Sequence, residues 1–214
     1  GPAFGMDANQ LLSWHKYGGG RELLAKLYAS VGGNIVSFPY GPMPTQPLGW
    51  FKKPITKVED FKGMKFRGFG LYTRVLDVLG ATSVTLAAGD VYAALERGVV
   101  DGAAFPNLGL FEFGLTKVTP YIVMPPYLPF RYSYYMNPAS FDAFPADIQK
   151  YLKDTVFALE GPSDQYWIQA RDAEAVKLKD SGMKEITLAP AESKRLDTII
   201  HTELWKYIVE KSPT

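Results

Sequence analysis

The stretches GMKFRGFG at residues 63–70 and LAAGDVYAALERGVVDGAAF at residues 86–105 decide the fold of this chain. Apolar runs predict strands over residues 65–68, 83–86 and 99–105, and apolar positions at helical spacing predict helices over 72–79 and 89–97. This alternation with short links is typical of an α/β fold with a mainly parallel sheet covered by helices. Ligands of such sheets bind at the carboxyl ends of the strands, where Arg67 and Phe105 stand.

The flanking sequence predicts further elements around this centre. We expect helices over residues 7–17, 21–31, 108–115, 145–181 and 191–211, a short helical turn over 58–63, and strands over 34–38, 49–51, 118–123, 130–136 and 184–188. Residues 49–51 read as a strand that runs from exposed to buried. Four prolines within residues 39–47 predict a stiff, extended connection. Gly161 and Pro162 predict a kink or a restart in the long helix.

Composition excludes several classes of function. The 23 lysines and arginines nearly balance the 22 acidic residues, so nothing points to a nucleic acid or a membrane surface as partner. The chain has no cysteine and two histidines, which removes thiolate chemistry and disfavours sites built on histidine. No hydrolase, phosphate-loop, zinc-protease or dinucleotide motif is present. The sequence therefore favours binding over catalysis.

Arg67 is the first candidate for a ligand contact. A guanidinium at the end of a strand can hold a carboxylate through two parallel hydrogen bonds, although an arginine there can equally be an ordinary surface or salt-bridged residue. Asp90 is expected at the start of a helix and Asp101 is expected to satisfy backbone groups. Arg131, among aromatic residues, is either a second anion contact or a solvent-exposed side chain.

The same stretches carry a resemblance to a known family. LAAGDVYAALERGVVDGAA resembles the signature of the DctP-type solute receptors of TRAP transporters, and KGMKFRGFG is similar to the strand that precedes it there. PLGWFKKPI, TKVTPYIVMP and AFGMDANQ also fit, so the resemblance covers essentially the whole chain. Seven residues of the signature share one register, namely Asp90, Tyr92, Ala94, Leu95, Gly98, Asp101 and Gly102.

The resemblance implies a periplasmic binding protein of two α/β lobes, joined by crossing strands and a long spanning helix, with the ligand in the cleft. Residues 1–44 would be the remainder of lobe 1 and residues 45–125 would be lobe 2 with its βαβ core. Residues 126–165 would return to lobe 1 and begin the long helix, and 166–214 would pack mainly on lobe 2. The chain starts after the family's opening βαβ segment and also stops early, so we expect lobe 1 to be incomplete.

The resemblance also implies a set of ligand residues. The arginine that pairs with the substrate carboxylate falls on Arg67. The AFGM opening and the pattern of Gln46, Gly49 and Trp50 are closest to the branch that binds 2-oxo acids and related monocarboxylates. The expected substrate-binding residues are Arg67, Gln46, Trp50, Phe69, Phe105, Asn107, Tyr127 and Arg131, with aromatic rings shaping the pocket and Gln46 and Asn107 donating hydrogen bonds.

Two departures from that branch bear on a bound cation. Members of the branch can hold a metal ion with the substrate through acidic residues, but Ala104 stands where a glutamate is expected. The acid expected in the later aromatic link is missing from PPYLPFRYS, which offers Arg131 instead. We therefore expect no metal and no cofactor, and a more anionic or larger ligand held directly by arginine.

The leading hypothesis is a periplasmic receptor that binds a small organic acid, does no chemistry, and delivers it to TRAP membrane permease subunits. A signal peptide is not in this chain, no nucleic acid is expected as partner, and a dimer is allowed. One rival is an enzyme on a similar α/β scaffold, which would need a positioned base or nucleophile. The other is a ligand-sensing domain that signals to a partner.

Overall fold

The computed structural model describes residues 6, 8–30, 32–33, 35–124 and 128–211, with the backbone alone for residues 8, 39–45 and 128–132. The chain forms two compact units. The first unit contains Met6–Pro44 and Pro129–Ala170, and the second contains Thr45–Leu128 and Arg171–Thr214. Among the described residues, no helix combines the length and the apolar character needed to cross a bilayer.

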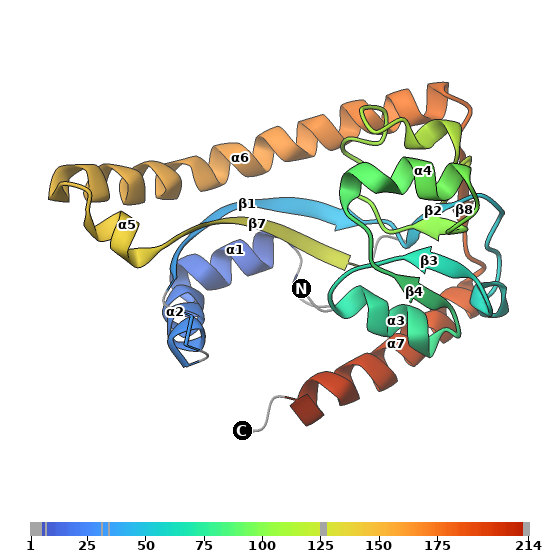
Figure 1. Ribbon diagram of the computed structural model, residues 1–214, viewed down its shortest axis with the longest axis horizontal. Helices are drawn as coiled ribbons and strands as arrows, with labels where there is room; N and C mark the ends of the chain where they lie inside the picture. The colour runs from blue at the N-terminus through green and yellow to red at the C-terminus, as the bar shows by residue number, and fades with distance from the viewer. Residues whose placement is uncertain (1–5, 7, 31, 34, 125–127, 212–214) are drawn as a thin grey trace. The chain divides into compact units, whose positions relative to one another are not determined.

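A six-stranded sheet forms the centre of the second unit (Figure 1). The strand order is β4 (Thr82–Val84), β3 (Lys65–Arg67), β5 (Gly102–Ala103), β2 (Gly49–Phe51), β6 (Tyr121–Met124) and β8 (Lys184–Thr187). Strand β3 is parallel to β4 and β5, and β6 is parallel to β8, whereas β2 runs antiparallel to both of its neighbours. The sheet is therefore mixed, and the start of β2 lies at the edge where β3, β5 and β6 end.

Helices cover both faces of this sheet. On one face, α3 (Leu71–Val78) and α7 (Pro190–Lys211) pack over a core that includes Phe51 and Phe66. On the other face, α4 (Val91–Glu96) and the last turns of α6 (Ala146–Asp180) pack over a second core that includes Trp50 and Ile122. Trp50 and Phe51 belong to different cores because neighbouring side chains of a strand point to opposite faces.

The first unit is built from helices and one two-stranded sheet. Its elements are α1 (Ala8–Tyr17), α2 (Gly20–Ser30), α5 (Pro138–Asp142), most of α6, and the paired strands β1 (Val36–Gln46) and β7 (Leu128–Met136). Glu160 of α6 is 1% exposed and accepts hydrogen bonds from Arg21 Nη2 at 2.7 Å on both oxygens. Lys16 Nζ lies 3.4 Å from the same carboxylate. This ion cluster ties α1 and α2 to α6.

Short 3₁₀ turns complete the second unit, at Val58–Phe61 (η1), Ala88–Asp90 (η2) and Leu115–Lys117 (η3). The helix predicted over residues 108–115 is wrong, since this segment is a series of turns before η3. Gly109 and Gly114 have φ angles of +93° and +67°, and a helix cannot continue through such left-handed residues. The strand predicted over 99–105 shrinks to β5 because the amides of Val99 and Val100 both donate to the carbonyl of Ala94 at the end of α4.

The structure refines three other predictions. The extended conformation predicted for residues 39–47 is confirmed over most of its length, but it is part of β1 rather than an unpaired connection, and its prolines are tolerated because each strand of a two-stranded sheet has a free edge. Strand β2 is buried along its whole length rather than from one end, because it lies between β5 and β6. Helix α6 runs through Gly161 and Pro162, so the predicted restart does not occur, while the kink that was its alternative stays a prediction.

Candidate functional site

The guanidinium of Arg67 is the centre of the candidate site. Arg67 is the last residue of β3 and is 7% exposed. Its Nη1 donates to the carbonyl of Ala104 at 2.7 Å, while Nε and Nη2 donate to the carbonyl of Leu86 at 3.2 and 3.1 Å. Burial lowers the pKa of this guanidinium, which nevertheless stays protonated because an arginine titrates far above neutral pH.

These contacts fix the cation without using all of its donors. An arginine has five N–H groups, and three of those of Arg67 donate to the carbonyls of Leu86 and Ala104, so within the described residues two N–H groups have no acceptor. The rings of Phe69 and Phe105 lie 5.0 and 5.8 Å from the guanidinium carbon. A guanidinium fixed in this way beside aromatic rings is suited to bind a carboxylate, which accepts charge-assisted hydrogen bonds from its N–H groups.

Gln46 and Asn107 bring further polar atoms to the same edge of the sheet. Gln46 comes three residues before β2 and Asn107 four residues after β5, and the antiparallel course of β2 places both at the edge where β3 ends. Gln46 is 4% exposed. Its Nε2 atom and Oδ1 of Asn107 are buried and have no hydrogen-bond partner among the described residues. An unmet buried polar atom costs about 1–3 kcal/mol, so an incoming polar ligand is favoured here.

Aromatic residues frame this edge in different ways. Trp50 has no exposed surface, and its Nε1 donates to the carbonyl of Phe105 at 2.8 Å, so it holds the end of β5 from within the core. Phe105 is buried and Phe69 is half-buried. Tyr127 lies outside the described residues, and so does the side chain of Arg131.

Asp101 and Gly102 position β5 against β3. The carboxylate of Asp101 accepts a hydrogen bond from the amide of Lys65 at 2.9 Å, which confirms its predicted role toward the backbone. A Cβ atom on Gly102 would lie 2.6 Å from Cε2 of Phe66, so only glycine allows this close packing. Asp90 does stand at the start of α4, but its side chain makes no cap hydrogen bond there.

The carbonyl oxygens that orient Arg67 escaped sequence reasoning. Leu86 and Ala104 act through their backbone, and no side-chain pattern marks a residue for that role.

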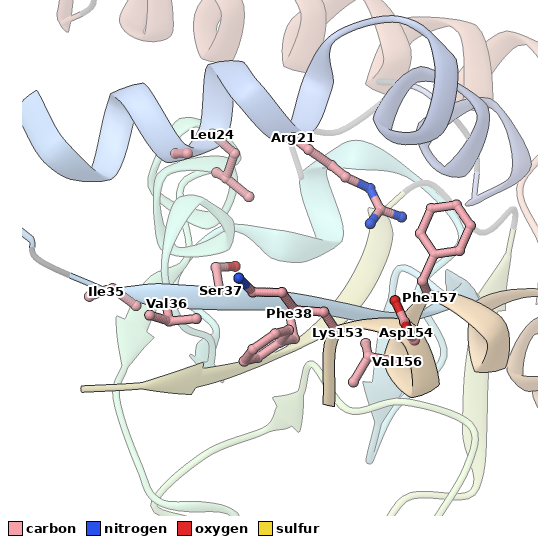
Figure 2. A pocket seen from close by; sticks show the side chains of 11 residues that line it. Arg21, Leu24, Ile35, Val36, Ser37, Phe38, Lys153, Asp154, Val156 and Phe157 are labelled. Carbon is pink, nitrogen blue, oxygen red and sulfur yellow. The ribbon is translucent and has the colours of Figure 1, made fainter. Parts of the chain in front are cut away.

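The sequence also did not predict a cavity of about 380 Å³ in the first unit (Figure 2). Figure 2 shows Arg21 of α2 and Phe157 of α6 at its wall, and their guanidinium carbon and ring centroid are 4.6 Å apart. The sequence around Arg21 contains no motif that would have identified this arginine as a cavity residue.

The chain matches a known protein family over nearly its whole length. The family model described as bacterial extracellular solute-binding protein, family 7 (DctP) matches residues 3–212. The chain belongs to this family. Family 7 consists of solute-binding proteins of TRAP transporters, which confirms the resemblance seen in the sequence, and its description names binding proteins and not enzymes, as predicted.

Two curated proteins illustrate the range of relatives. A monocarboxylate 2-oxoacid-binding periplasmic protein of Nostoc is 38% identical over 125 residues, which cover 57% of this chain and 33% of that protein. An ectoine/5-hydroxyectoine-binding periplasmic protein of Ruegeria pomeroyi is 26% identical over 163 residues, which cover 75% of this chain and 47% of that protein. The matches thus span about a third to a half of these relatives.

Solved structures of family 7 proteins superpose on nearly the whole chain. A TRAP periplasmic solute-binding protein of Colwellia psychrerythraea, with bound calcium and pyruvate, has a TM-score of 0.85 at 30% identity and covers 99% of this chain and 65% of that one. A Bordetella bronchiseptica protein with copurified calcium and picolinate has a TM-score of 0.86 at 28% identity and covers 100% of this chain and 63% of that one. These similarities confirm the two-lobed α/β solute-binding fold.

Proposed function

We propose that this chain is the ligand-binding part of a periplasmic receptor that holds a small organic acid and delivers it to TRAP membrane permease subunits. The observation that carries the proposal is the guanidinium of Arg67, which is fixed by two carbonyls and keeps two N–H groups for a carboxylate. The Nostoc relative is named for 2-oxoacids, and the Colwellia structure contains pyruvate. Both names support an organic acid as the ligand of this family 7 chain.

Each residue of the site has a distinct proposed role. Arg67 neutralises the charge of the carboxylate and donates hydrogen bonds to it, and Gln46 donates a hydrogen bond from Nε2. Asn107 accepts a hydrogen bond at Oδ1 from a donor group of the ligand. Phe69 and Phe105 exclude water around the ion pair, which strengthens it. Trp50 acts indirectly, because it holds the Phe105 carbonyl.

Tyr127 and Arg131 remain proposed ligand contacts on the strength of the sequence alone, and Arg131 stands in the link where the resembling branch has an acid. Tyr127 comes between β6 and β7 in the chain, and Arg131 is the fourth residue of β7. Tyr127 would add an aromatic wall and Arg131 a second positive charge.

The residues at the edge do not fit a bound cation of the kind present in two of the similar structures, which contain calcium or sodium with pyruvate. Calcium prefers carboxylate and carbonyl oxygens. Ala104 and Phe105 bring no side-chain oxygen, and their carbonyls already accept from Arg67 and Trp50. No group of three histidine or acidic side chains able to hold a metal occurs among the described residues. We therefore propose direct binding of the acid by Arg67.

Calorimetric titration with pyruvate tests the arginine assignment. Replacing Arg67 by alanine removes two charged hydrogen bonds, so the affinity should fall at least about 100-fold, since each hydrogen bond to a charged group contributes roughly 1.5–3 kcal/mol and about 1.4 kcal/mol is a factor of ten. Arg67→Lys should also bind weakly, because an ammonium group cannot reproduce the planar fork. The control is Arg74→Ala, which removes an exposed arginine that lies 5.1 Å from the ring of Tyr207 on α7. Equal affinity in the Arg67 variants and the wild type would refute the assignment.

A further inference from the structure

A cavity of about 820 Å³ opens in the second unit, between the last turns of α6 and one face of β6 and β8. Its walls are mainly apolar and include Ile122, Met124, Leu178 and Met183. Pro47 and Asn107 also line it. Ligand sites for small molecules usually have volumes of about 300–1,000 Å³, apolar walls and a few polar groups, and this cavity has each of these features.

The cavity begins at the edge of the sheet that carries Arg67. Pro47 is next to Gln46 and comes just before β2, and Asn107 follows β5. Met124 is the last residue of β6, so it stands at this edge as well. Met183 immediately precedes β8 and Glu185 is its second residue, so both lie toward the opposite edge. The cavity therefore runs from the Arg67 edge inward along the sheet face, beneath α6.

Strand spacing sets the distance that a ligand must bridge. Adjacent strands lie about 4.8 Å apart, so β5 is roughly 5 Å and β2 roughly 10 Å from β3. The residues at the near end of the cavity follow β5 or precede β2, whereas β6 is a further strand away. A three-carbon acid held at Arg67 would leave the cavity unfilled, whereas a longer acid would reach past Asn107 into it.

We infer that the ligand of the Arg67 edge is an amphipathic carboxylic acid, with a medium-length aliphatic chain or a ring that lies in the cavity beneath α6. This inference rests on the proposed function, and it names the class of acid. Burying apolar ligand atoms against Met124, Leu178 and Met183 gains affinity in proportion to the area removed from water. Methionine side chains adapt to ligand shape, which suits chains and rings alike.

The polar groups of the lining fit an amphipathic acid better than an extended polar ligand. Arg171 already pairs with Asp172, at 2.7 Å. Lys179 and Glu185 have opposite charges and come from different walls, α6 and β8. The buried Oδ1 atom of Asn107 is the polar group at the near end without a partner among the described residues. One hydrogen-bond donor near the carboxylate, followed by apolar atoms, is the ligand pattern that this lining matches.

Calorimetric titration of the full chain with a homologous series of 2-oxo acids tests the inference. Pyruvate and 2-oxooctanoate share a headgroup and differ only in methylene groups, so any difference in affinity reports burial of the chain. We expect 2-oxooctanoate to bind at least tenfold more tightly than pyruvate. In Ala175→Phe, a ring added at the α6 wall should remove this preference and leave pyruvate binding unchanged.

The matched control is Ala173→Phe, which makes the same change at an exposed position of α6 that does not line the cavity. This variant should keep the preference for 2-oxooctanoate. Equal affinities for the two acids in the wild type, or an unchanged preference in Ala175→Phe, would overturn the inference while leaving Arg67-dependent binding of pyruvate intact. Absence of binding by both acids would instead overturn the proposed function and the inference together.

Discussion

Arg67 shows how far a single residue can be interpreted from sequence. Its place at the end of a strand followed from the KFR pattern, whereas the choice of a carboxylate as its partner came from the family resemblance. Its burial and its two carbonyl acceptors did not follow, because they depend on how β4 and β5 pack beside β3. Gln46 was placed in the site by the family resemblance, and the course of β2 supplies the physical reason for its position at this edge.

Gly102 should be needed for the packing of β5 against β3, because the backbone of β5 lies close to the ring of Phe66. Gly102→Ala places a methyl group 2.6 Å from Phe66 and 2.8 Å from the carbonyl of Trp50, and overpacking of this kind lowers the free energy of unfolding by about 1–3 kcal/mol. Urea denaturation measures the change. Gly89→Ala is the control, since a Cβ there would meet no atom within 4 Å. Equal stability of the two variants would show that β5 has room to shift.

The elements show where sequence patterns are reliable and where tertiary context decides. Helices α1, α2, α3 and α7 follow the predicted ranges within two residues at each end, because apolar periodicity, with a glycine stop after each of the first three, is a local signal. Strand β1 was missed over its proline-rich part because its pairing with β7 is a long-range contact. The turns at residues 108–114 were read as a helix because a left-handed glycine cannot be told from a helical one in sequence.

Helix α6 contains a buried carboxylate that should make the stability of the chain depend on pH. Asp164 is buried, and burial raises the pKa of its carboxyl group. The folded state therefore disfavours the charged form, a cost that is present above the folded-state pKa and absent below the unfolded-state value of about 3.9.

Asp164→Asn should accordingly raise the free energy of unfolding at pH 7, and the gain should vanish as the pH falls toward 3. Urea denaturation at several pH values measures it. Asp154→Asn, which alters an exposed carboxylate paired with Lys150 on the same helix, should bring no gain at any pH. A gain for Asp164→Asn that persists at pH 3 would exclude the burial of charge as its cause.

The two units of the whole molecule are connected by three elements. Strands β1 and β7 and helix α6 each contain one of the boundaries between the units. Crossing strands and a long spanning helix were expected from the family resemblance and not from periodicity, because local patterns do not reveal which segments share a core. The similar structures of family 7 extend beyond this chain, which covers 63–65% of two of them. Delivery of a ligand to a permease is therefore a proposal about the whole receptor.

A crystal structure of the chain with pyruvate, grown in the presence of a chelator, tests the central claim most directly. The carboxylate should lie at the edge where β3 ends, with its oxygens about 2.7–2.9 Å from the Nη atoms of Arg67 and with no cation beside it. The carbonyls of Leu86 and Ala104 should keep their hydrogen bonds to the same guanidinium. Pyruvate bound elsewhere, with Arg67 contacting only these two carbonyls, would contradict the account.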